Sequence, residues 1–399
     1  MIRSNIPIVL TASACWETAH PVNAHQIARR LAARGQRVLF VESTGLRAPS
    51  PAGNRHDLHR VLHRLRDMWR PVREVEPRLC VLSPFALPPL GPRRWRDANL
   101  RWVAGRIAQA AQRAGWERPV LWSFLPTHWP LADRLAARLL VYHCVDDYTA
   151  NPGVDAAWLV ALEKRMLRRA NLVFAASPVL AERLRRERQD VLCFPNVADV
   201  ELFQRAVNEE LPEPVELAAL PHPRFVYVGN LAGYRIDFAL LLALARSRPD
   251  AALVLIGSMG LGDTREPPAA FRELSQLPNV RLLDAKPQTE LPAFLRHCDV
   301  ALIPFLDNAH TRSSLPLKLW EYLAAGLPVV TTALPNFLEL AEGSWLRTAA
   351  DAQAFLHAVS EAALELPAER KPRSERAQAH GWPQRMDELC ARIAERLNV

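Results

Sequence analysis

The chain has 399 residues, of which 49% are hydrophobic and 23% are charged. At about 150 residues per domain, this length predicts two or three domains, and the composition excludes a disordered, collagen-like or low-complexity chain. Fifty basic residues against 42 acidic residues give a net charge of +8, which suits a nucleic acid, an anionic membrane face or a phosphorylated small molecule as partner.

Targeting and redox features are sparse. No apolar run reaches the roughly 18 residues of a membrane-spanning helix. The first apolar run, about seven residues long, predicts a β-strand rather than a signal peptide. The six cysteines lie far apart without a CxxC pair, which argues against a zinc site or a redox motif and favours a reducing compartment. We therefore expect a cytoplasmic protein without a metal.

Apolar runs alternate with helical patterns through the first half of the chain. This alternation predicts βαβ units and a parallel sheet covered by helices on both faces. Strands are expected at 6–12, 37–42, 78–84, 119–124, 139–145 and 171–177, and helices at 25–36, 93–115 and 155–170.

Residues 204–224 interrupt the alternation with an acidic, proline-rich stretch, which predicts a linker. The pattern then restarts, with strands at 224–230, 251–257, 279–286, 299–305 and 328–332, and helices at 238–247, 290–298 and 317–326.

The fold class is therefore α/β, with two Rossmann-like doubly wound domains at 1–203 and 225–380. A C-terminal helix in 381–399 is long enough to pack back on the first domain. Open α/β sheets bind ligands at the carboxyl ends of their strands, so we expect a cleft between the two domains there.

The segment 310–332 carries the most informative pattern. A helix is expected to begin near Leu315, with Ser313 and Ser314 suited to the N-cap and Pro316 to the first turn. Free backbone N–H groups at such a helix start form an anion site that suits a diphosphate.

Lys318 and Glu321 follow on the same helix face, three residues apart. A carboxylate just beyond a phosphate site can accept two hydrogen bonds from the vicinal hydroxyls of a ribose. The alternative is an ordinary capped helix whose lysine and glutamate form a surface pair.

The segment 224–237 runs from a buried strand into Gly229 and Gly233, and then into Arg235 and Asp237. Glycines let a backbone approach a phosphate closely, and an arginine can bind it through two hydrogen bonds. The alternative is a tight turn with a solvent-facing arginine.

The glycine-rich loop that begins at Gly257 could face a nucleotide base. It lacks the GxGxxG order and a βαβ dinucleotide context, so it is weak evidence for NAD.

Residues 224–342 resemble the donor half of GT-B-fold glycosyltransferases, in particular the retaining GT4-like family. EYLAAGLPVV resembles that family's EAMACGxPVV, and VGNLAGYRID resembles VGRLxxxKGxD. Residues 170–203 resemble its ADxVxxxS and PNGVDxxxF segments. YHCVDDY together with PLKLWEYLAAG is similar to the branch that includes teichuronic-acid and exopolysaccharide transferases.

The resemblance implies roles for individual residues. It places Glu321 against the donor ribose and Arg235 at the position of the family's phosphate-binding lysine. The sequence differs from the family at Asn230, where the family has an arginine. It also differs at Ser313, eight residues before Glu321, where the family often has a glutamate.

The resemblance also implies a function. The C-terminal domain would bind a UDP- or GDP-linked sugar, and the N-terminal domain would present a hydroxyl of a saccharide, lipid-linked or other acceptor in cell-surface polysaccharide or glycoconjugate synthesis. Transfer would be retaining, without a cofactor or metal. Two alternatives stay open, a non-hydrolysing sugar-nucleotide epimerase and a non-catalytic nucleotide-sugar-binding protein. No nucleic-acid partner is expected.

On the acceptor side, strand 139–145 carries His143 and is followed by Asp146 and Asp147. Titratable groups at the carboxyl end of a strand face the ligand cleft, where they can orient or deprotonate a hydroxyl. The alternative is that an aspartate caps the next segment and that His143 is packed.

The first loop contains Trp16 and His20, which we expect to border the acceptor, with the tryptophan stacking on a sugar. A tryptophan that fills an apolar gap is the alternative. His56, His59 and His63 share one face of a basic amphipathic pattern, which predicts either a helix on an anionic membrane or a solvated helix. Peripheral contact with the inner face of the cytoplasmic membrane is therefore expected to accompany a cytoplasmic location.

Overall fold

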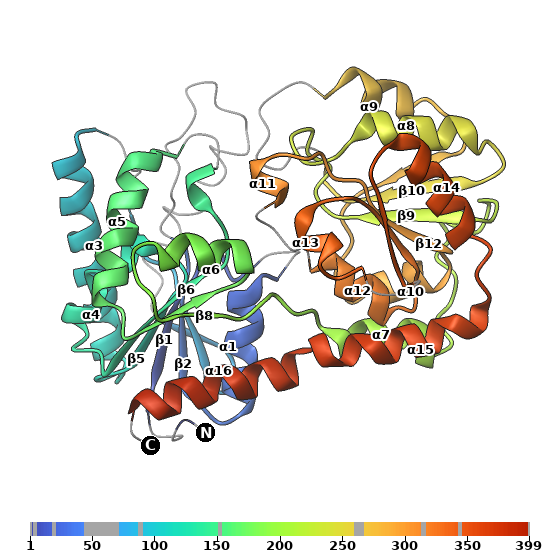
Figure 1. Cartoon of the computed structure of the whole chain (residues 1–399). Coiled ribbons are helices and arrows are strands. Elements are labelled where there is room, and N and C mark those ends of the chain that lie inside the picture. Colours follow the sequence, from blue (N-terminus) through green and yellow to red (C-terminus); the bar gives the residue numbers. More distant parts are fainter. Residues whose placement is uncertain are drawn as a thin grey trace. The chain divides into compact units, whose positions relative to one another are not determined.

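The computed structural model divides into two compact units, Met1–Pro195 with Met386–Val399, and Asn196–Arg385 (Figure 1). The residues that it describes are 2, 6–17, 21–43, 72–86, 91–150, 154–258, 267–312, 317–341 and 345–397.

The first unit contains an eight-stranded sheet in the order β3-β4-β2-β1-β5-β6-β7-β8. All pairs are parallel except β3 with β4. The strands are β1 (Ile8–Thr11), β2 (Val38–Val41), β3 (Arg73–Glu76), β4 (Leu79–Leu82), β5 (Val120–Ser123), β6 (Leu139–Cys144), β7 (Leu172–Ala175) and β8 (Val191–Cys193). The predicted parallel, helix-covered sheet is confirmed.

Helices cover both faces of this first sheet (Figure 1). They are α1 (Asn23–Ala33), α3 (Arg93–Arg113), α4 (Leu131–Arg134), α5 (Ala156–Arg169) and α6 (Pro178–Arg185). On one face, inward side chains of the strands pack with α3, α4, α5 and α6, as Leu121 does with Ile107 and Met166 in one buried cluster. Continuous apolar strands therefore reflect burial on both sides.

The C-terminal helix α16 (Trp382–Leu397) carries residues of both units, since its portion from Met386 belongs to the first. In that portion, Asp387 forms an ion pair with Arg34 at 2.7 Å. Among the described residues, no helix is both long and apolar enough to cross a bilayer.

The second unit contains a fully parallel six-stranded sheet in the order β11-β10-β9-β12-β13-β14. The strands are β9 (Arg224–Val228), β10 (Ala252–Ile256), β11 (Val280–Leu283), β12 (Val300–Ile303), β13 (Val329–Thr332) and β14 (Leu346–Ala349). The chain moves outward from β9 to β11, and then returns to the other side of β9 at β12. The strand order therefore reverses between β9 and β12, where doubly wound sheets bind ligands.

The helices of the second unit lie on both faces of its sheet (Figure 1). They are α7 (Val200–Asn208), α8 (Phe238–Ser247), α9 (Ala269–Leu274), α10 (Leu291–Arg296), α11 (Ala309–Arg312), α12 (Lys318–Ala324), α13 (Pro335–Leu338), α14 (Ala352–Ala362) and α15 (Arg370–Arg376). Helix α12 begins at Lys318, with Leu317 at its N-cap, later than the start predicted near Leu315. With seven residues, α12 has a weak helix dipole, which contributes little to an anion site at its N-terminus.

Residues 204–224, which the sequence analysis assigns to a linker, lie inside the second unit. Their first residues belong to α7. Leu217 is fully buried in the core of this unit, and the Arg224 guanidinium pairs with Glu213 at 2.5 Å. Residues 204–224 are therefore not a free linker. They form a surface segment of acidic and proline-rich composition, which Leu217 anchors to the core of the second unit.

Shortening Leu217 tests this anchoring. Leu217→Ala is expected to lower the free energy of unfolding of the second unit by about 2–5 kcal/mol, because a fully buried side chain is removed. Val215→Ala is the matched control, since Val215 is 84% exposed and its change should stay within about 0.5 kcal/mol. Calorimetric unfolding measures both. Equal stabilities of the two variants would show that the segment is a free linker.

Candidate functional site

Two cations lie at the point where the strand order of the second unit reverses. The Arg235 guanidinium lies over the Phe305 ring at 5.1 Å, and Lys318 Nζ lies 5.3 Å from the centre of the same ring. Phe305 follows β12, and Arg235 follows β9. Two cations beside one ring repel each other, so an anion between them would be stabilised by both.

The Lys318 ammonium is held in a partly buried position. It donates a hydrogen bond to the Tyr227 hydroxyl at 2.9 Å and lies 4.3 Å from the centre of the Tyr227 ring. Burial, together with the charge of Arg235, lowers the pKa of Lys318 to about 7. A bound anion would raise this pKa, so the lysine is poised to gain a proton when an anion binds.

Glu321 lies on α12 with Lys318. Its Oε1 accepts a hydrogen bond from Gln288 Nε2 at 3.1 Å. Burial raises the pKa of Glu321 to about 7, while Lys318 and Gln288 act in the opposite direction. The predicted pairing of Lys318 and Glu321 on one helix face is therefore present, and Gln288, which the sequence analysis missed, orients the carboxyl group. Its position after β11 gave no sequence signal.

Gly229 and Gly257 lie where the loops that follow β9 and β10 approach each other closely. Gly229 N donates to the Ile256 carbonyl at 2.8 Å. A Cβ at Gly257 would lie 1.9 Å from the Gly229 carbonyl oxygen, and a Cβ at Gly229 would lie 2.6 Å from Lys318 Nζ. Both residues have positive φ, 142° and 153°. Only glycine fits at these positions, because the two backbones and the lysine approach so closely.

Two tyrosine hydroxyls hold the end of β9. Tyr322 Oη accepts a hydrogen bond from Val228 N at 2.7 Å, and Tyr227 Oη donates to the Asn230 carbonyl at 3.2 Å. The loop that carries Asn230 and Arg235 is therefore fixed to α12 and β9. Sequence patterns gave no indication of this role, because a buried tyrosine resembles any other core aromatic.

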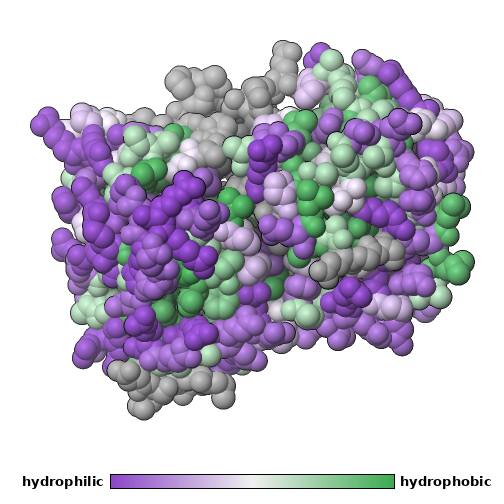
Figure 2. All heavy atoms as spheres, viewed as in Figure 1, coloured by the Kyte–Doolittle hydropathy of each residue, from purple (hydrophilic) through white to green (hydrophobic). Residues whose placement is uncertain are grey.

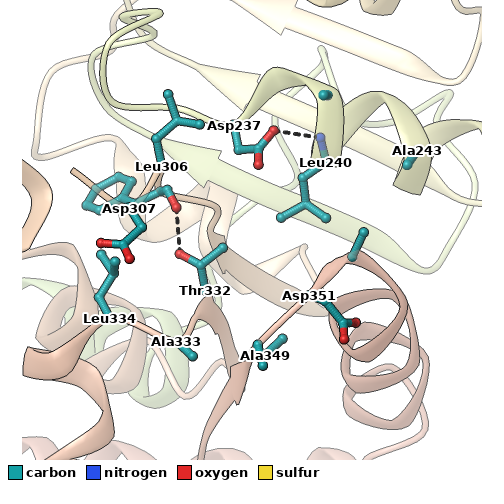
Figure 3. Close-up of a pocket in the computed structure, with 14 residues that line it drawn as sticks. Asp237, Leu240, Ala243, Leu306, Asp307, Thr332, Ala333, Leu334, Ala349 and Asp351 are labelled. Carbon is teal, nitrogen blue, oxygen red and sulfur yellow. Dashed lines mark hydrogen bonds between the residues drawn. The ribbon is translucent and has the colours of Figure 1, made fainter.

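Asp237 follows Arg235 by two residues and begins the next helix. Its Oδ1 accepts a hydrogen bond from Leu240 N at 2.9 Å, so it is the N-cap of α8. It lines a cavity of about 380 Å³ that also contains Asp307 and Asp351, and Figure 3 shows it turned toward its own helix. Capping α8 is thus the role that the geometry shows for Asp237, which the sequence analysis groups with the donor-binding residues.

Several predicted positions lie outside the described residues. These are Ser313 and Ser314 in the donor segment, His20 in the first loop, and the basic segment with His56, His59 and His63. Among the residues that the structure does describe, no cluster of three or more His, Cys, Asp or Glu could hold a metal ion.

In the first unit, His143 lies in an aromatic cluster. The imidazole is buried and stacks on Phe124 at 5.1 Å, with Phe174 edge-on at 5.7 Å. Trp122 Nε1 donates to His143 Nδ1 at 3.4 Å, which leaves the proton of a neutral ring on Nε2. This environment favours the packed alternative for His143.

Asp147 follows the end of β6 and orders the next segment. Its Oδ1 accepts a hydrogen bond from Thr149 N at 3.1 Å, and Arg183 Nε lies 3.9 Å from its Oδ2. Asp146 Oδ1 accepts from Asp147 N at 2.9 Å. Both carboxylates are partly exposed, so they remain accessible to a ligand hydroxyl.

A buried polar network beneath Asp147 was not found from the sequence. Arg183 donates to both carboxylate oxygens of Glu163, at 2.5 and 3.1 Å, and the Tyr142 hydroxyl donates to Glu163 at 2.7 Å. Burial opposes the charge of Arg183, but Glu163 raises its pKa above the ordinary value. Satisfied networks of this kind fix side-chain positions.

Trp16 packs within the first unit. Its ring lies edge-on to Phe40 at 5.0 Å and 5.4 Å from His25, with the Arg29 guanidinium over it at 4.8 Å. Its backbone N–H donates to Glu42 Oε1 at 2.6 Å. These contacts favour the alternative for this residue, a tryptophan that packs in the fold, although the residue is still partly exposed.

Comparisons with known proteins concern the family and the fold. Residues 222–364 match the family model described as glycosyl transferases group 1. The chain is 26% identical over 235 residues to a Bacillus subtilis protein named as a teichuronic acid biosynthesis glycosyltransferase, covering 56% of this chain and 57% of the relative. It is 25% identical over 199 residues to an Escherichia coli protein named as a colanic acid biosynthesis glycosyltransferase, covering 48% and 47%. The alignments thus span about half of each relative's length.

Solved structures are similar over the whole chain. Sucrose-phosphate synthase from Thermosynechococcus elongatus has a TM-score of 0.67 at 18% identity, covering 98% of each chain. Anabaena HepE, solved in complex with UDP and glucose, has a TM-score of 0.66 at 14% identity, covering 98% of this chain and 99% of its own. The two units define the GT-B fold. Residues 222–364 belong to the glycosyl transferases group 1 family, so the chain carries a glycosyltransferase domain.

The close approach of the two glycines predicts the effect of a single methyl group. Gly257→Ala is expected to destabilise the second unit by about 3 kcal/mol or more, because its Cβ would overlap a backbone carbonyl that cannot move freely. Gly105→Ala is the control, since its Cβ meets nothing within 4 Å and alanine favours the helix by roughly 1 kcal/mol. Thermal unfolding distinguishes them, and equal Tm values would contradict the packing.

The raised pKa of Glu321 predicts a pH dependence of stability. Between pH 4.5 and about 7, the folded protein keeps this carboxyl protonated and the unfolded chain does not, so the free energy of unfolding falls as pH rises. Glu321→Gln removes this slope and is expected to be about 2–3 kcal/mol more stable than wild type at pH 7, but equal near pH 4.

Urea unfolding across this pH range measures the difference. Glu375→Gln, on the exposed face of α15, is the control and should follow the wild-type curve. A Glu321→Gln variant that parallels wild type at every pH would show that the carboxyl is not buried as described.

Proposed function

We propose that the protein transfers a sugar from a nucleotide diphosphate sugar to an acceptor hydroxyl in the synthesis of a cell-surface polysaccharide or glycoconjugate. One observation carries this proposal: Arg235 and Lys318 lie beside the same ring at the reversal of the strand order, with Glu321 on the same helix as the lysine. Two cations and a carboxyl group match the diphosphate and the ribose of such a donor.

Donor binding follows from these side chains. The diphosphate lies between Arg235 and Lys318, close to the Gly229 backbone, and Glu321 accepts hydrogen bonds from the ribose hydroxyls. Gly257 keeps the neighbouring loop free of a Cβ. We take Asn230, Ser313 and Ser314 as further donor contacts, because Asn230 and Ser313 stand at family motif positions and Ser314 adjoins Ser313 in the predicted anion segment. The solved neighbours bound to UDP or a UDP-sugar support a UDP-linked donor.

The chemistry is leaving-group stabilisation combined with acceptor activation. As the bond between the sugar and the diphosphate breaks, negative charge grows on the departing phosphate, and the two fixed cations stabilise it. This electrostatic role is why we propose that transfer needs no metal ion. We assign orientation or deprotonation of the acceptor hydroxyl to Asp146 and Asp147 of the first unit, with retention of configuration as in the family resembled.

The acceptor is proposed to be a saccharide or a lipid-linked saccharide, as the names of the relatives in polysaccharide synthesis suggest. A lipid-linked acceptor favours peripheral contact with the inner face of the cytoplasmic membrane. The relatives are named glycosyltransferases, which does not favour the epimerase alternative.

Nucleotide binding tests the donor site. UDP, GDP, ADP and CMP are added to the wild-type protein, and thermal unfolding is followed. One nucleotide diphosphate is expected to stabilise the protein by about 2.7 kcal/mol at 100 times its dissociation constant. Lys318→Met should weaken this binding at least about tenfold, because a cation facing a phosphate is lost. Lys371→Met, on an exposed lysine of α15, should bind as wild type does.

Measuring turnover then distinguishes a transferase from an epimerase and from a non-catalytic binding protein. With the sugar conjugate of that nucleotide, transfer requires an added acceptor, an epimerase isomerises the donor alone, and a binding protein does neither. No stabilisation by any nucleotide, or equal binding by Lys318→Met, would contradict the proposal.

A further inference from the structure

Helix α3 of the first unit carries two exposed tryptophans. Trp95 is 65% exposed and Trp102 is 48% exposed. They are seven residues apart, which is close to two helical turns, so both lie on the same face. Trp102 is steadied by an edge-on contact with Phe85 at 6.0 Å. A single exposed apolar residue is common, but two large aromatic side chains aligned on one helix face are not.

Other sides of α3 pack in the fold. Val103 and Ile107 point into the core of the unit. Arg96 pairs with Asp155 at 2.8 Å and lies over the Trp158 ring at 4.8 Å, which fixes α3 to α5. Trp95, on the face away from these contacts, therefore adds little to the packing of the helix.

Arginines border the two tryptophans. Arg94 precedes Trp95, Arg101 precedes Trp102, and Arg106 lies one turn beyond Trp102. In the part of the chain that the structure describes, none of the three forms an ion pair, and all are exposed. The surface over α3 is mostly hydrophilic in Figure 2. This agrees with its arginines and with the Kyte–Doolittle hydropathy scale, on which tryptophan is mildly polar.

We propose that this face of α3, formed by Trp95 and Trp102 with Arg94, Arg101 and Arg106, binds the surface of an anionic bilayer. Tryptophan combines an apolar ring with an N–H donor and is enriched at the boundary between lipid headgroups and acyl chains. The arginines complement the negative headgroups, each contributing about 1 kcal/mol near the surface.

A bilayer fits this face better than a protein partner. A stable protein interface needs more than about 1,000 Å² with a packed apolar centre, whereas this face is a convex helix with only two large apolar side chains. The biological purpose of this bilayer contact rests on the proposed function, because a lipid-linked acceptor would lie at such a surface. Lipid binding itself is measurable without donor or acceptor.

Vesicle flotation of the full chain tests the proposal. Vesicles of phosphatidylcholine alone are compared with vesicles that also contain phosphatidylglycerol. Wild type is expected to float with the anionic vesicles and not with the neutral ones, and the bound fraction should fall as salt screens the arginines. Trp95→Ser with Trp102→Ser is expected to lower the partition coefficient at least about tenfold, and Arg94→Ala with Arg101→Ala by about fivefold for each arginine.

Two further variants keep the test decisive. Trp95→Ser alone alters only the more exposed ring and should weaken binding without changing Tm. Leu364→Ser with Leu366→Ser removes two other exposed apolar side chains and should bind as wild type does. Undiminished binding by the double tryptophan variant, equal binding to neutral vesicles, lack of binding by wild type, or loss of binding in the leucine variant would each overturn the proposal.

Nucleotide-induced stabilisation, measured without vesicles, reports on the donor site separately. If no nucleotide stabilises the protein but vesicle binding is observed, the proposed function is refuted and the bilayer contact is supported. The reverse result would refute the contact alone. A shift to dimer or capture of an acidic protein that requires Trp95 and Trp102, without vesicle binding, would assign the face to another partner and also overturn the proposal.

Discussion

The placement of Arg235 and Lys318 beside one ring is the constraint on which the proposed donor site depends. Both cations lie within about 5 Å of the Phe305 ring centre, and burial and mutual repulsion lower the pKa of the lysine to about 7. An arrangement of this kind costs stability unless an anion compensates it. The Tyr322 hydroxyl bonds α12 to the end of β9, and the Tyr227 hydroxyl accepts a hydrogen bond from Lys318. Gly229 and Gly257 let the loops after β9 and β10 approach each other closely, so these contacts hold the two cations in place.

The first unit is organised in the opposite way. Polar groups near the end of β6 have close partners: Arg183 pairs with Glu163 in a buried network, and Asp147 accepts a hydrogen bond from Thr149. The cation pair of the second unit and the partly exposed carboxylates of the first unit suit the proposed nucleotide donor and the proposed acceptor hydroxyl, respectively.

Edge elements were the hardest to predict from the sequence. The strands that the pattern missed, β3, β8 and β14, are each outermost in their sheet, where one side lacks a neighbour and an apolar run is not required. The same reasoning explains residues 204–224, whose exposed prolines and acids obscured the buried Leu217. Asp237 shows a related ambiguity, because capping and ligand binding use the same side chain in the same sequence context.

The sequence by itself determined the alternation of apolar strands and helices, the doubly wound class, and the presence of Arg235, Lys318 and Glu321 in motifs typical of nucleotide-sugar binding. These features are local, since burial on both faces and helical spacing leave their mark within a few residues. Only the tertiary structure decided that the two cations share one ring, that Gln288 holds Glu321, and that His143 is packed. Such contacts join residues far apart in the chain, and their distances depend on how strands and helices pack.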